Sequence, residues 1–96
     1  MTATSKFSAT IEDSYRARTR VSEALYKEAR LAISSGITHD SRFTFPYPIS
    51  VARALGPRKW DVDGNEYVDY FGGHGALLLG HSHPAVVDAV QQQMEL

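Results

Sequence analysis

Glycine and histidine residues gather in one short stretch near the C-terminal end of the chain. Residues 71–84 read FGGHGALLLGHSHP and contain four glycines and three histidines. Glycine at this density is typical of places where the backbone must adopt unusual φ values or approach another group closely. Imidazole can donate or accept hydrogen bonds and can titrate near neutral pH. This stretch is therefore the part of the sequence that most resembles a functional site.

Metal binding is one chemistry that these side chains could support. The His-Ser-His spacing of His81 and His83 would place both rings on one face of a strand, which suits zinc, but a zinc site needs further rigid ligands. The simpler alternative is that both rings bond backbone groups in the turn before Pro84. A second candidate cluster consists of the three carboxylates of Asp61, Asp63 and Asp69, which could serve acid–base or metal chemistry. In a hairpin, however, aspartates are commonly turn formers. We predict no metal site.

A β-hairpin is predicted immediately before the glycine-rich stretch. The sequence Asp63-Gly64-Asn65 tolerates positive φ and separates two aromatic and β-branched runs, residues 59–62 and 66–70. Strand alternation turns Asp61 and Asp69 away from an apolar face that carries Trp60, Val62, Val68 and Tyr70. With a short strand over residues 49–54, the pattern predicts three antiparallel strands.

Helices are predicted before and after these strands along the chain, which gives an α+β fold class. Apolar residues at helical spacing predict an amphipathic helix over residues 11–33, with Gly36 as its left-handed cap. Pro84 suits the first position of a second helix, which continues to residue 96 without a stop signal. We expect residues 1–10 to be a mobile arm, residues 38–48 an extended connector, and residues 11–96 a segment that is truncated within its last helix.

Composition limits the classes of partner and location. The chain has 96 residues, 43% hydrophobic and 22% charged, enough for one small folded domain. A formal net charge of -1 with scattered basic residues argues against nucleic acid or a membrane surface as the partner. No run approaches the roughly 20 apolar residues of a membrane helix. The absence of cysteine agrees with a reducing compartment, so we expect a cytoplasmic protein.

Residues 59–90, KWDVDGNEYVDYFGGHGALLLGHSHPAVVDAV, resemble the N-terminal part of the class III aminotransferases, which depend on pyridoxal phosphate. The D-x-D-G-N-x-Y-x-D hairpin followed by L-G-H-x-H-P carries this resemblance. The spacing is most similar to the branch of glutamate-1-semialdehyde 2,1-aminomutase and its aspartate-aminotransferase-family relatives. The resemblance implies part of the small N-terminal domain of an α/β pyridoxal-phosphate-dependent transferase of fold type I.

The same resemblance implies a substrate side to this segment. It implies a homodimeric transaminase or aminomutase that moves an amino group on a carboxylate-bearing amino, keto or aldehyde substrate. Arg42 falls where the aminomutase branch has an arginine that binds the substrate carboxylate, a task for which a planar guanidinium is suited. The alternative for Arg42 is a solvated surface arginine. His74 falls where the branch often has a tryptophan in the substrate pocket, Gly73 replaces a serine before it, and His39 falls where a serine lies near the substrate.

No catalytic residue is assigned in this segment. In the family, the lysine that attaches pyridoxal phosphate, the aspartate that pairs with its ring nitrogen and the loop that holds its phosphate belong to other segments. Lys6, Lys27 and Lys59 lie where a solvated ammonium is expected, whereas a nucleophilic lysine must lose its charge. We therefore expect the chain alone to be inactive. The alternative function is a small non-enzymatic interaction module, or a truncated remnant, that binds a protein partner.

Overall fold

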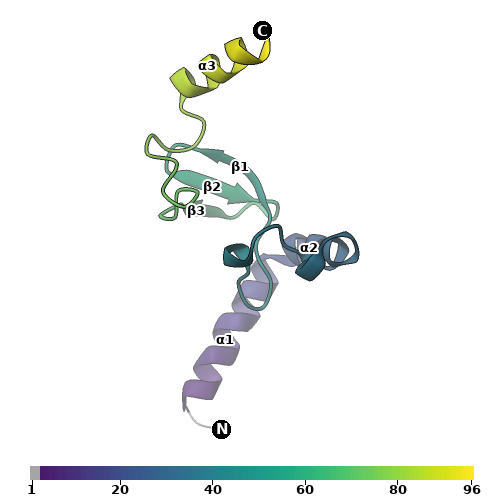
Figure 1. Cartoon of the computed structure of the whole chain (residues 1–96). Helices are drawn as coiled ribbons and strands as arrows, with labels where there is room; N and C mark the ends of the chain where they lie inside the picture. Colours follow the sequence, from purple (N-terminus) through teal and green to yellow (C-terminus); the bar gives the residue numbers. More distant parts are fainter. Residues whose placement is uncertain (1–2) are drawn as a thin grey trace. The chain divides into compact units, whose positions relative to one another are not determined.

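The computed structural model describes residues 3–96, with side chains from residue 10 onward. Its elements, in chain order, are α1 (Ala3–Arg18), α2 (Arg20–Ala32), the 3-10 turns η1 (Ser34–Gly36) and η2 (Asp40–Arg42), β1 (Val51–Leu55), β2 (Arg58–Asp61), β3 (Glu66–Val68) and α3 (Pro84–Met94) (Figure 1). The strands form a three-stranded sheet in the order β1-β2-β3. The expected α+β class, with an antiparallel sheet between helices, is confirmed.

The chain divides into two compact units. The first contains the residues up to Ser50 together with the hairpin turn Asp61–Asn65, and the second contains Val51–Trp60 and Glu66–Leu96. The first unit therefore holds α1, α2, both 3-10 turns and the turn of the hairpin. The second holds the sheet, the glycine-rich loop and α3.

The N-terminal helical region is broken at Thr19. The apolar spacing, in contrast, predicts one continuous helix over residues 11–33. Thr19 has φ -132° and ψ 40°, which are not helical values, and it is 1% exposed. Its Oγ1 donates to the carbonyl of Tyr15 at 2.7 Å and lies 3.0 Å from the hydroxyl of Tyr47. A threonine hydroxyl that bonds the carbonyl four residues earlier perturbs a helix. The single-helix prediction is wrong because a contact with a distant residue fixes this break.

The start of α1 also differs from the expectation. The helix begins at Ala3, so residues 3–10 are helical where we expected an arm without regular structure. The sequence ATSKFSAT contains neither glycine nor proline, and extending an existing helix is much easier than nucleating one. Residues 1 and 2 of the expected arm lie outside the described residues.

The beginning of α2 is capped by a residue of the hairpin turn. Asp63 accepts hydrogen bonds from the backbone N–H of Val21 at 2.7 Å and from the backbone N–H and hydroxyl of Ser22, both at 2.9 Å. No side chain at the N-cap position itself does this. Burial raises the pKa of Asp63, but these three hydrogen bonds outweigh it and lower the pKa overall. The carboxylate also complements the positive end of the helix dipole.

A tyrosine pair joins the connector to α1. Tyr47 is 2% exposed and is the one buried apolar side chain among residues 10–96. Its ring centroid lies 5.3 Å from that of Tyr15, whose hydroxyl donates to the Tyr47 carbonyl at 2.7 Å. Burial and the neighbouring Tyr47 and Asp61 raise the pKa of Tyr15. The interior of the first unit is therefore small and partly polar.

The hairpin forms as predicted, although its faces do not. β2 and β3 pair antiparallel with the register Arg58↔Val68, Lys59↔Tyr67 and Trp60↔Glu66, which confirms the turn between them. Tyr70 is 96% exposed, whereas Asp61 is only 3% exposed. Asp61 is buried because its Oδ1 accepts from the backbone N–H groups of Asp63 and Asn65, at 3.0 and 2.8 Å. The predicted apolar face is wrong, because the carboxylate organises the turn from inside.

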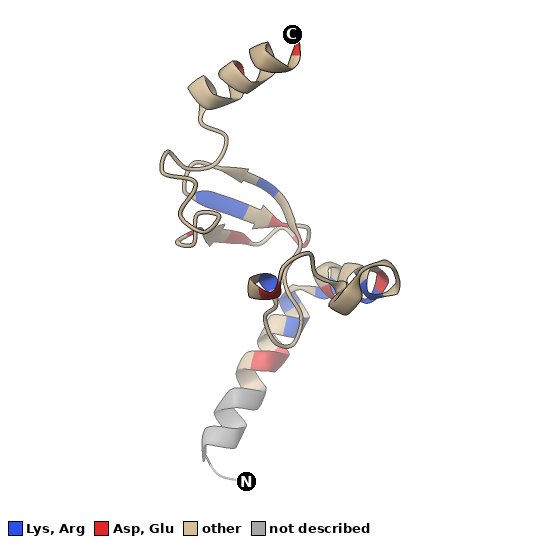
Figure 2. Cartoon of the chain, viewed as in Figure 1, with Lys and Arg blue, Asp and Glu red and all other residues tan. Residues whose placement is uncertain are grey.

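The last helix begins at Pro84, as predicted from the fixed φ of proline. Figure 2 shows residues of both charge signs within α2 and, separately, within the sheet, whereas α3 is almost entirely uncharged. Apolar side chains of α3, including Val86, Val90 and Met94, are exposed. No helix among the described residues is long and apolar enough to cross a membrane.

Candidate substrate-side site

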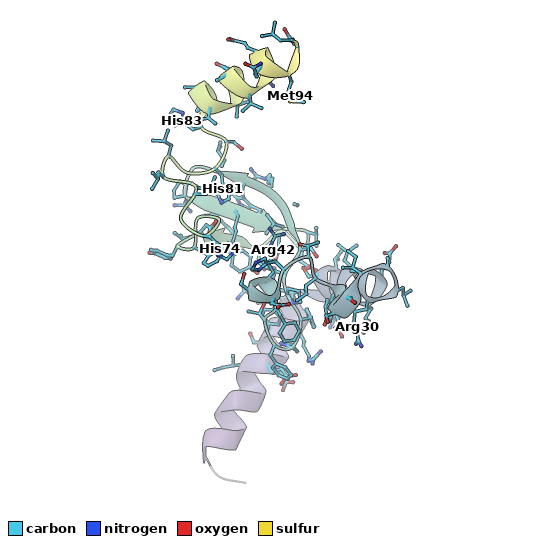
Figure 3. The ribbon with its side chains drawn as sticks, viewed as in Figure 1. Arg30, Arg42, His74, His81, His83 and Met94 are labelled. Carbon is cyan, nitrogen blue, oxygen red and sulfur yellow. The ribbon has the colours of Figure 1, made fainter. Side chains whose placement is uncertain are left out.

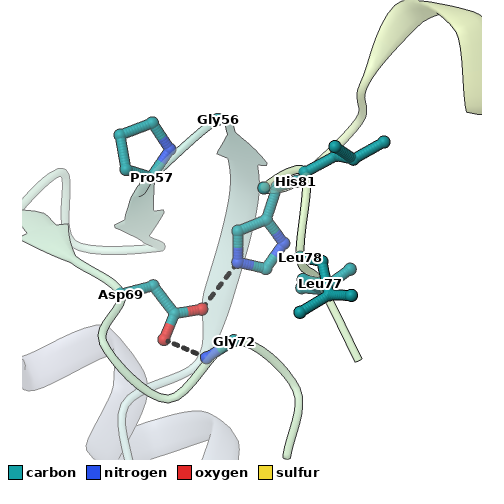
Figure 4. A pocket seen from close by; sticks show the side chains of 9 residues that line it. Gly56, Pro57, Asp69, Gly72, Leu77, Leu78 and His81 are labelled. Atoms are coloured by element: carbon teal, nitrogen blue, oxygen red, sulfur yellow. Dashed lines mark hydrogen bonds and ion pairs between the residues drawn. The ribbon is translucent and has the colours of Figure 1, made fainter. Parts of the chain in front are cut away.

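The glycine-rich loop between β3 and α3 is held at both ends by Asp69. Its Oδ1 accepts from the backbone N–H groups of Phe71 at 3.0 Å and Gly72 at 3.2 Å, where the loop begins. Its Oδ2 lies 2.6 Å from Nε2 of His81, where the loop ends. Lys59 of β2 adds an ion pair, with its Nζ 3.5 Å from Oδ1. One carboxylate therefore fixes both ends of the loop to the sheet (Figure 4).

The surroundings of Asp69 keep it ionised. Its side chain is 6% exposed, and burial alone would favour the protonated form. The hydrogen bond from His81, followed by that from the N–H of Gly72, outweighs burial and lowers the pKa of Asp69 to about 2. Both histidines were expected to bond backbone groups; for the side chain of His81 this is wrong, because it contacts a carboxylate.

The end of the loop is also attached through its backbone. Gly56 and His81 form an isolated antiparallel bridge, with both N–H···O distances 2.8 Å. Gly80, with φ 78°, lies directly against this bridge, and a Cβ placed there would come within 2.9 Å of the carbonyl of Gly56. Only glycine therefore fits at position 80 without displacing the backbone.

An open cleft of about 360 Å³ lies between the loop and the turn after β1. Gly56 and Pro57 line it together with Leu77 to Leu79, and Asp69 and His81 contribute its polar atoms (Figure 4). Leu78 is exposed. The sequence patterns did not single out this cleft, because its polar pair comes from residues twelve apart.

Two of the predicted substrate residues, Gly73 and His74, lie together in the glycine-rich loop. Both have positive φ, 60° for Gly73 and 62° for His74. The ring of His74, which is labelled in Figure 3, packs edge-on against Phe71 with the centroids 4.5 Å apart. Positive φ is uncommon for a residue other than glycine, although histidine is among the residue types that adopt it more often. The loop backbone and the Phe71 ring thus set the position of the imidazole.

The other two predicted residues, His39 and Arg42, lie together in the first unit. His39 precedes η2, and its Nδ1 accepts from the backbone N–H of Ser41 at 3.2 Å. The backbone N–H of Arg42 donates to the carbonyl of His39 at 2.9 Å. The guanidinium of Arg42 is exposed and donates to the hydroxyl of Thr38 at 2.9 Å. The structure thus pairs His39 with Arg42 and Gly73 with His74, each pair within its own unit.

Both lysine side chains that the structure describes form ion pairs. Lys27 forms an ion pair with Glu23 at 2.9 Å, and Lys59 forms one with Asp69 at 3.5 Å. An amine that attacks an aldehyde must first leave such an ion pair. The side chain of Lys6 is outside the described residues. The described part of the chain also contains no group of three or more His, Cys, Asp or Glu side chains that could hold a metal ion.

Sequence comparisons relate the chain to known enzymes. The family model described as aminotransferase class-III matches residues 40–96. The chain is 40% identical over 74 residues to the glutamate-1-semialdehyde 2,1-aminomutase of Methanothrix thermoacetophila, covering 77% of this chain and 17% of that enzyme. It is 43% identical over 77 residues to the enzyme of the same name from Desulforamulus reducens, covering 77% and 18%. The chain therefore spans less than a fifth of the length of these relatives.

Solved structures show the same fold. A β-phenylalanine aminotransferase from Variovorax paradoxus is 26% identical with a TM-score of 0.86, over 91% of this chain and 20% of that one. A glutamate-1-semialdehyde aminomutase from Pseudomonas aeruginosa is 30% identical with a TM-score of 0.79, over 84% and 18%. These neighbours have the fold of type I pyridoxal-phosphate-dependent transferases, so the expected fold is confirmed. The family match and these similarities lead to one conclusion, that the chain belongs to the class-III aminotransferase family.

Proposed function

We propose that this chain is the N-terminal segment of a pyridoxal-phosphate-dependent transaminase or aminomutase, called here the parent enzyme. The parent moves an amino group on a carboxylate-bearing amino, keto or aldehyde substrate. Within it, the segment supplies substrate contacts, and other segments supply the lysine, the aspartate and the phosphate loop that hold the cofactor. The match over residues 40–96 supports the assignment to this family.

The uncompensated charge of Arg42 is the observation that carries this proposal. Its guanidinium donates to a neutral hydroxyl, that of Thr38, and no carboxylate among residues 10–96 forms an ion pair with it. The 3-10 turn behind it is fixed by backbone hydrogen bonds from Arg42 to His39 and from Phe43 to Asp40. A held guanidinium with unused donors can take a substrate carboxylate through two parallel hydrogen bonds.

Gly73 and His74 are proposed to form a wall of the substrate pocket. The positive φ of both residues turns the loop sharply at this point. Imidazole in place of the tryptophan of the aminomutase branch offers a polar group where indole offers mainly an apolar surface. The preferred substrate of the parent is therefore expected to differ from that of enzymes with the tryptophan. His39 is assigned a lesser role, which is to hold the turn that carries Arg42.

The proposal extends to the assembly and location of the parent. The resemblance to class III enzymes supports a homodimer whose active site lies at the subunit boundary. The absence of cysteine is compatible with a reducing compartment, and we place the parent in the cytoplasm. Exposed apolar side chains on α3 give the segment a surface that the rest of the parent can cover.

The experiment that tests this function uses the longest natural protein that contains this chain. It should be purified with pyridoxal phosphate and assayed for isomerisation of glutamate-1-semialdehyde and for amino-group transfer from a panel of α-, β- and ω-amino acids and of primary amines without a carboxylate. We expect cofactor-dependent turnover of at least one carboxylate-bearing substrate. A protein that binds the cofactor and turns over only substrates without a carboxylate would contradict the role of Arg42, and one with no amino-group transfer would contradict the function.

A further inference from the structure

Asp69 occupies a position that its place in the hairpin does not require. Asp61 and Asp63 already organise the turn and the start of α2. Asp69 lies directly after the last residue of β3, and its backbone N–H donates to the carbonyl of Pro57 at 2.8 Å, whereas its carboxylate accepts hydrogen bonds from the loop that follows. The hydrogen-bonding partners of its carboxylate are Phe71, Gly72 and His81, and Lys59 of β2 forms an ion pair with it.

The contacts of Asp69 act on two points that are separated along the chain. The N–H groups of Phe71 and Gly72 stand directly before Gly73 and His74, and His81 stands at the far end of the loop. Because both carboxylate oxygens are used, movement at either end of the loop breaks a hydrogen bond to a nearly buried charge. Such bonds are stronger than bonds between neutral groups, and a buried carboxylate is unfavourable without them.

The far end of the loop has little freedom of its own. The backbone of His81 forms a β-bridge with Gly56, and Gly80 packs against the carbonyl of Gly56. The ring of His81 thus extends from a fixed backbone to Asp69, and Lys59 holds Asp69 from β2. The sheet therefore determines the position of Asp69, and Asp69 determines the position of the residues that precede His74.

We propose that Asp69 is a positioning residue that holds the loop of Gly73 and His74 in the shape of the substrate pocket wall, with His81 as its partner. This inference rests on the proposed function, in which Gly73 and His74 contact the substrate. In this role Asp69 needs no contact of its own with the substrate. Its effect is exerted through the backbone N–H groups of Phe71 and Gly72.

The first measurement is amide hydrogen exchange in the 96-residue chain and does not depend on activity. Asp69→Asn keeps the shape of the side chain but removes its charge, and Asp88→Asn on the exposed face of α3 is the matched control. We expect exchange at Phe71 and Gly72 to be accelerated about tenfold or more in Asp69→Asn and to be unchanged in Asp88→Asn. Unchanged exchange at both amides in Asp69→Asn would overturn the proposal.

The second measurement separates positioning from simple stabilisation and uses the parent enzyme. We expect Asp69→Asn to raise the KM for the carboxylate substrate about tenfold, with a smaller change in kcat and unchanged cofactor content. His81→Gln keeps an N–H donor toward Asp69, so its KM should stay within about threefold of wild type. His81→Ala removes the donor and should raise KM as Asp69→Asn does. Equal KM values in all three variants, in an enzyme that transfers amino groups, would overturn the proposal. If the parent transfers no amino group, the proposed function fails while the exchange experiment still decides whether Asp69 holds the loop.

Discussion

The carboxylate of Asp63 accepts three hydrogen bonds from Val21 and Ser22, and its Oδ2 lies 2.9 Å from both the backbone nitrogen and the hydroxyl of Ser22. The Ser22 hydroxyl in turn accepts from the backbone N–H of Ser50 at 3.1 Å. A side chain of the hairpin turn thus caps the N-terminus of a helix that precedes it by about forty residues, and it joins three separate parts of the first unit. This relationship is part of the reason that residues Asp61–Asn65, which begin with the last residue of β2, belong to the first unit.

Replacing this cap should destabilise the first unit. We expect Asp63→Ala to lower the free energy of unfolding by about 1 to 2 kcal/mol, because the N–H groups of Val21 and Ser22 lose their acceptor. Asp13→Ala, an exposed aspartate of α1, is the matched control and should change stability by less than about 0.5 kcal/mol. Urea unfolding followed by circular dichroism measures both. Equal stabilities for the two variants would contradict the assignment of Asp63 as the cap.

The stabilisation by Asp69 should depend on pH in a defined direction. Its pKa is lowered from 3.8 to about 2 in the folded chain. The difference corresponds to about 2 kcal/mol, which is fully present above the unfolded pKa near 4 and is lost as the pH falls through 2. Asp69→Asn should therefore be less stable than wild type at about pH 5, and the two should converge near pH 2. A stability difference that is constant with pH would contradict an ionised, hydrogen-bonded Asp69.

Two glycines of the loop allow backbone strain to be separated from steric contact. Gly75 and Gly80 both have φ near 80°, but a Cβ at Gly80 would meet the carbonyl of Gly56 at 2.9 Å whereas a Cβ at Gly75 would meet nothing within 4 Å. We expect Gly75→Ala to lower the free energy of unfolding by about 1 kcal/mol and Gly80→Ala by about 3 kcal/mol. Chemical denaturation of both variants tests this. A Gly75→Ala variant as unstable as Gly80→Ala would show that the bridge of Gly56 and His81 is not the constraint.

Local signals predicted part of this structure well. The turn Asp63-Gly64-Asn65 and the position of Pro84 correctly predicted the hairpin and the start of α3, because both depend on φ preferences of neighbouring residues. The break at Thr19 was not predicted, since it depends on the hydroxyl of Tyr47, twenty-eight residues away. The D-x-D-G-N-x-Y-x-D motif carried the family resemblance, but the contacts of its aspartates could be identified only in the folded structure.

The same distinction applies to the candidate site. A glycine- and histidine-rich loop was visible in the sequence, and its density of positive φ is confirmed. The sequence pattern predicts an edge carboxylate at Asp69 and a ring bonded to the backbone at His81, because the pattern of one strand cannot show a partner twelve residues away. Their spacing beside a glycine-rich loop was the only sequence signal that could have suggested the pair.

The isolated 96-residue chain should not form a stable complex with pyridoxal phosphate. Lys27 and Lys59 form ion pairs with Glu23 and Asp69, and each amine would have to leave its partner to attack the cofactor aldehyde. After addition of the cofactor and dialysis, we expect no absorbance above that of the buffer in the visible range. A visible band that survives dialysis and disappears on changing Lys6, Lys27 or Lys59 to alanine would show that this segment attaches the cofactor by itself.

The most direct test of the proposed function is the kcat/KM of Arg42→Ala in the parent enzyme, measured with its carboxylate substrate. The loss of a charge-assisted, bidentate contact is expected to lower kcat/KM about ten- to a hundredfold, mainly by raising KM. The cofactor content should be unchanged. Arg20→Ala, an exposed arginine of α2, is the control and should stay within about twofold of wild type. If Arg42→Ala and Arg20→Ala have the same kcat/KM for every carboxylate substrate that the parent turns over, Arg42 is a solvated surface residue and this segment does not hold the anion site.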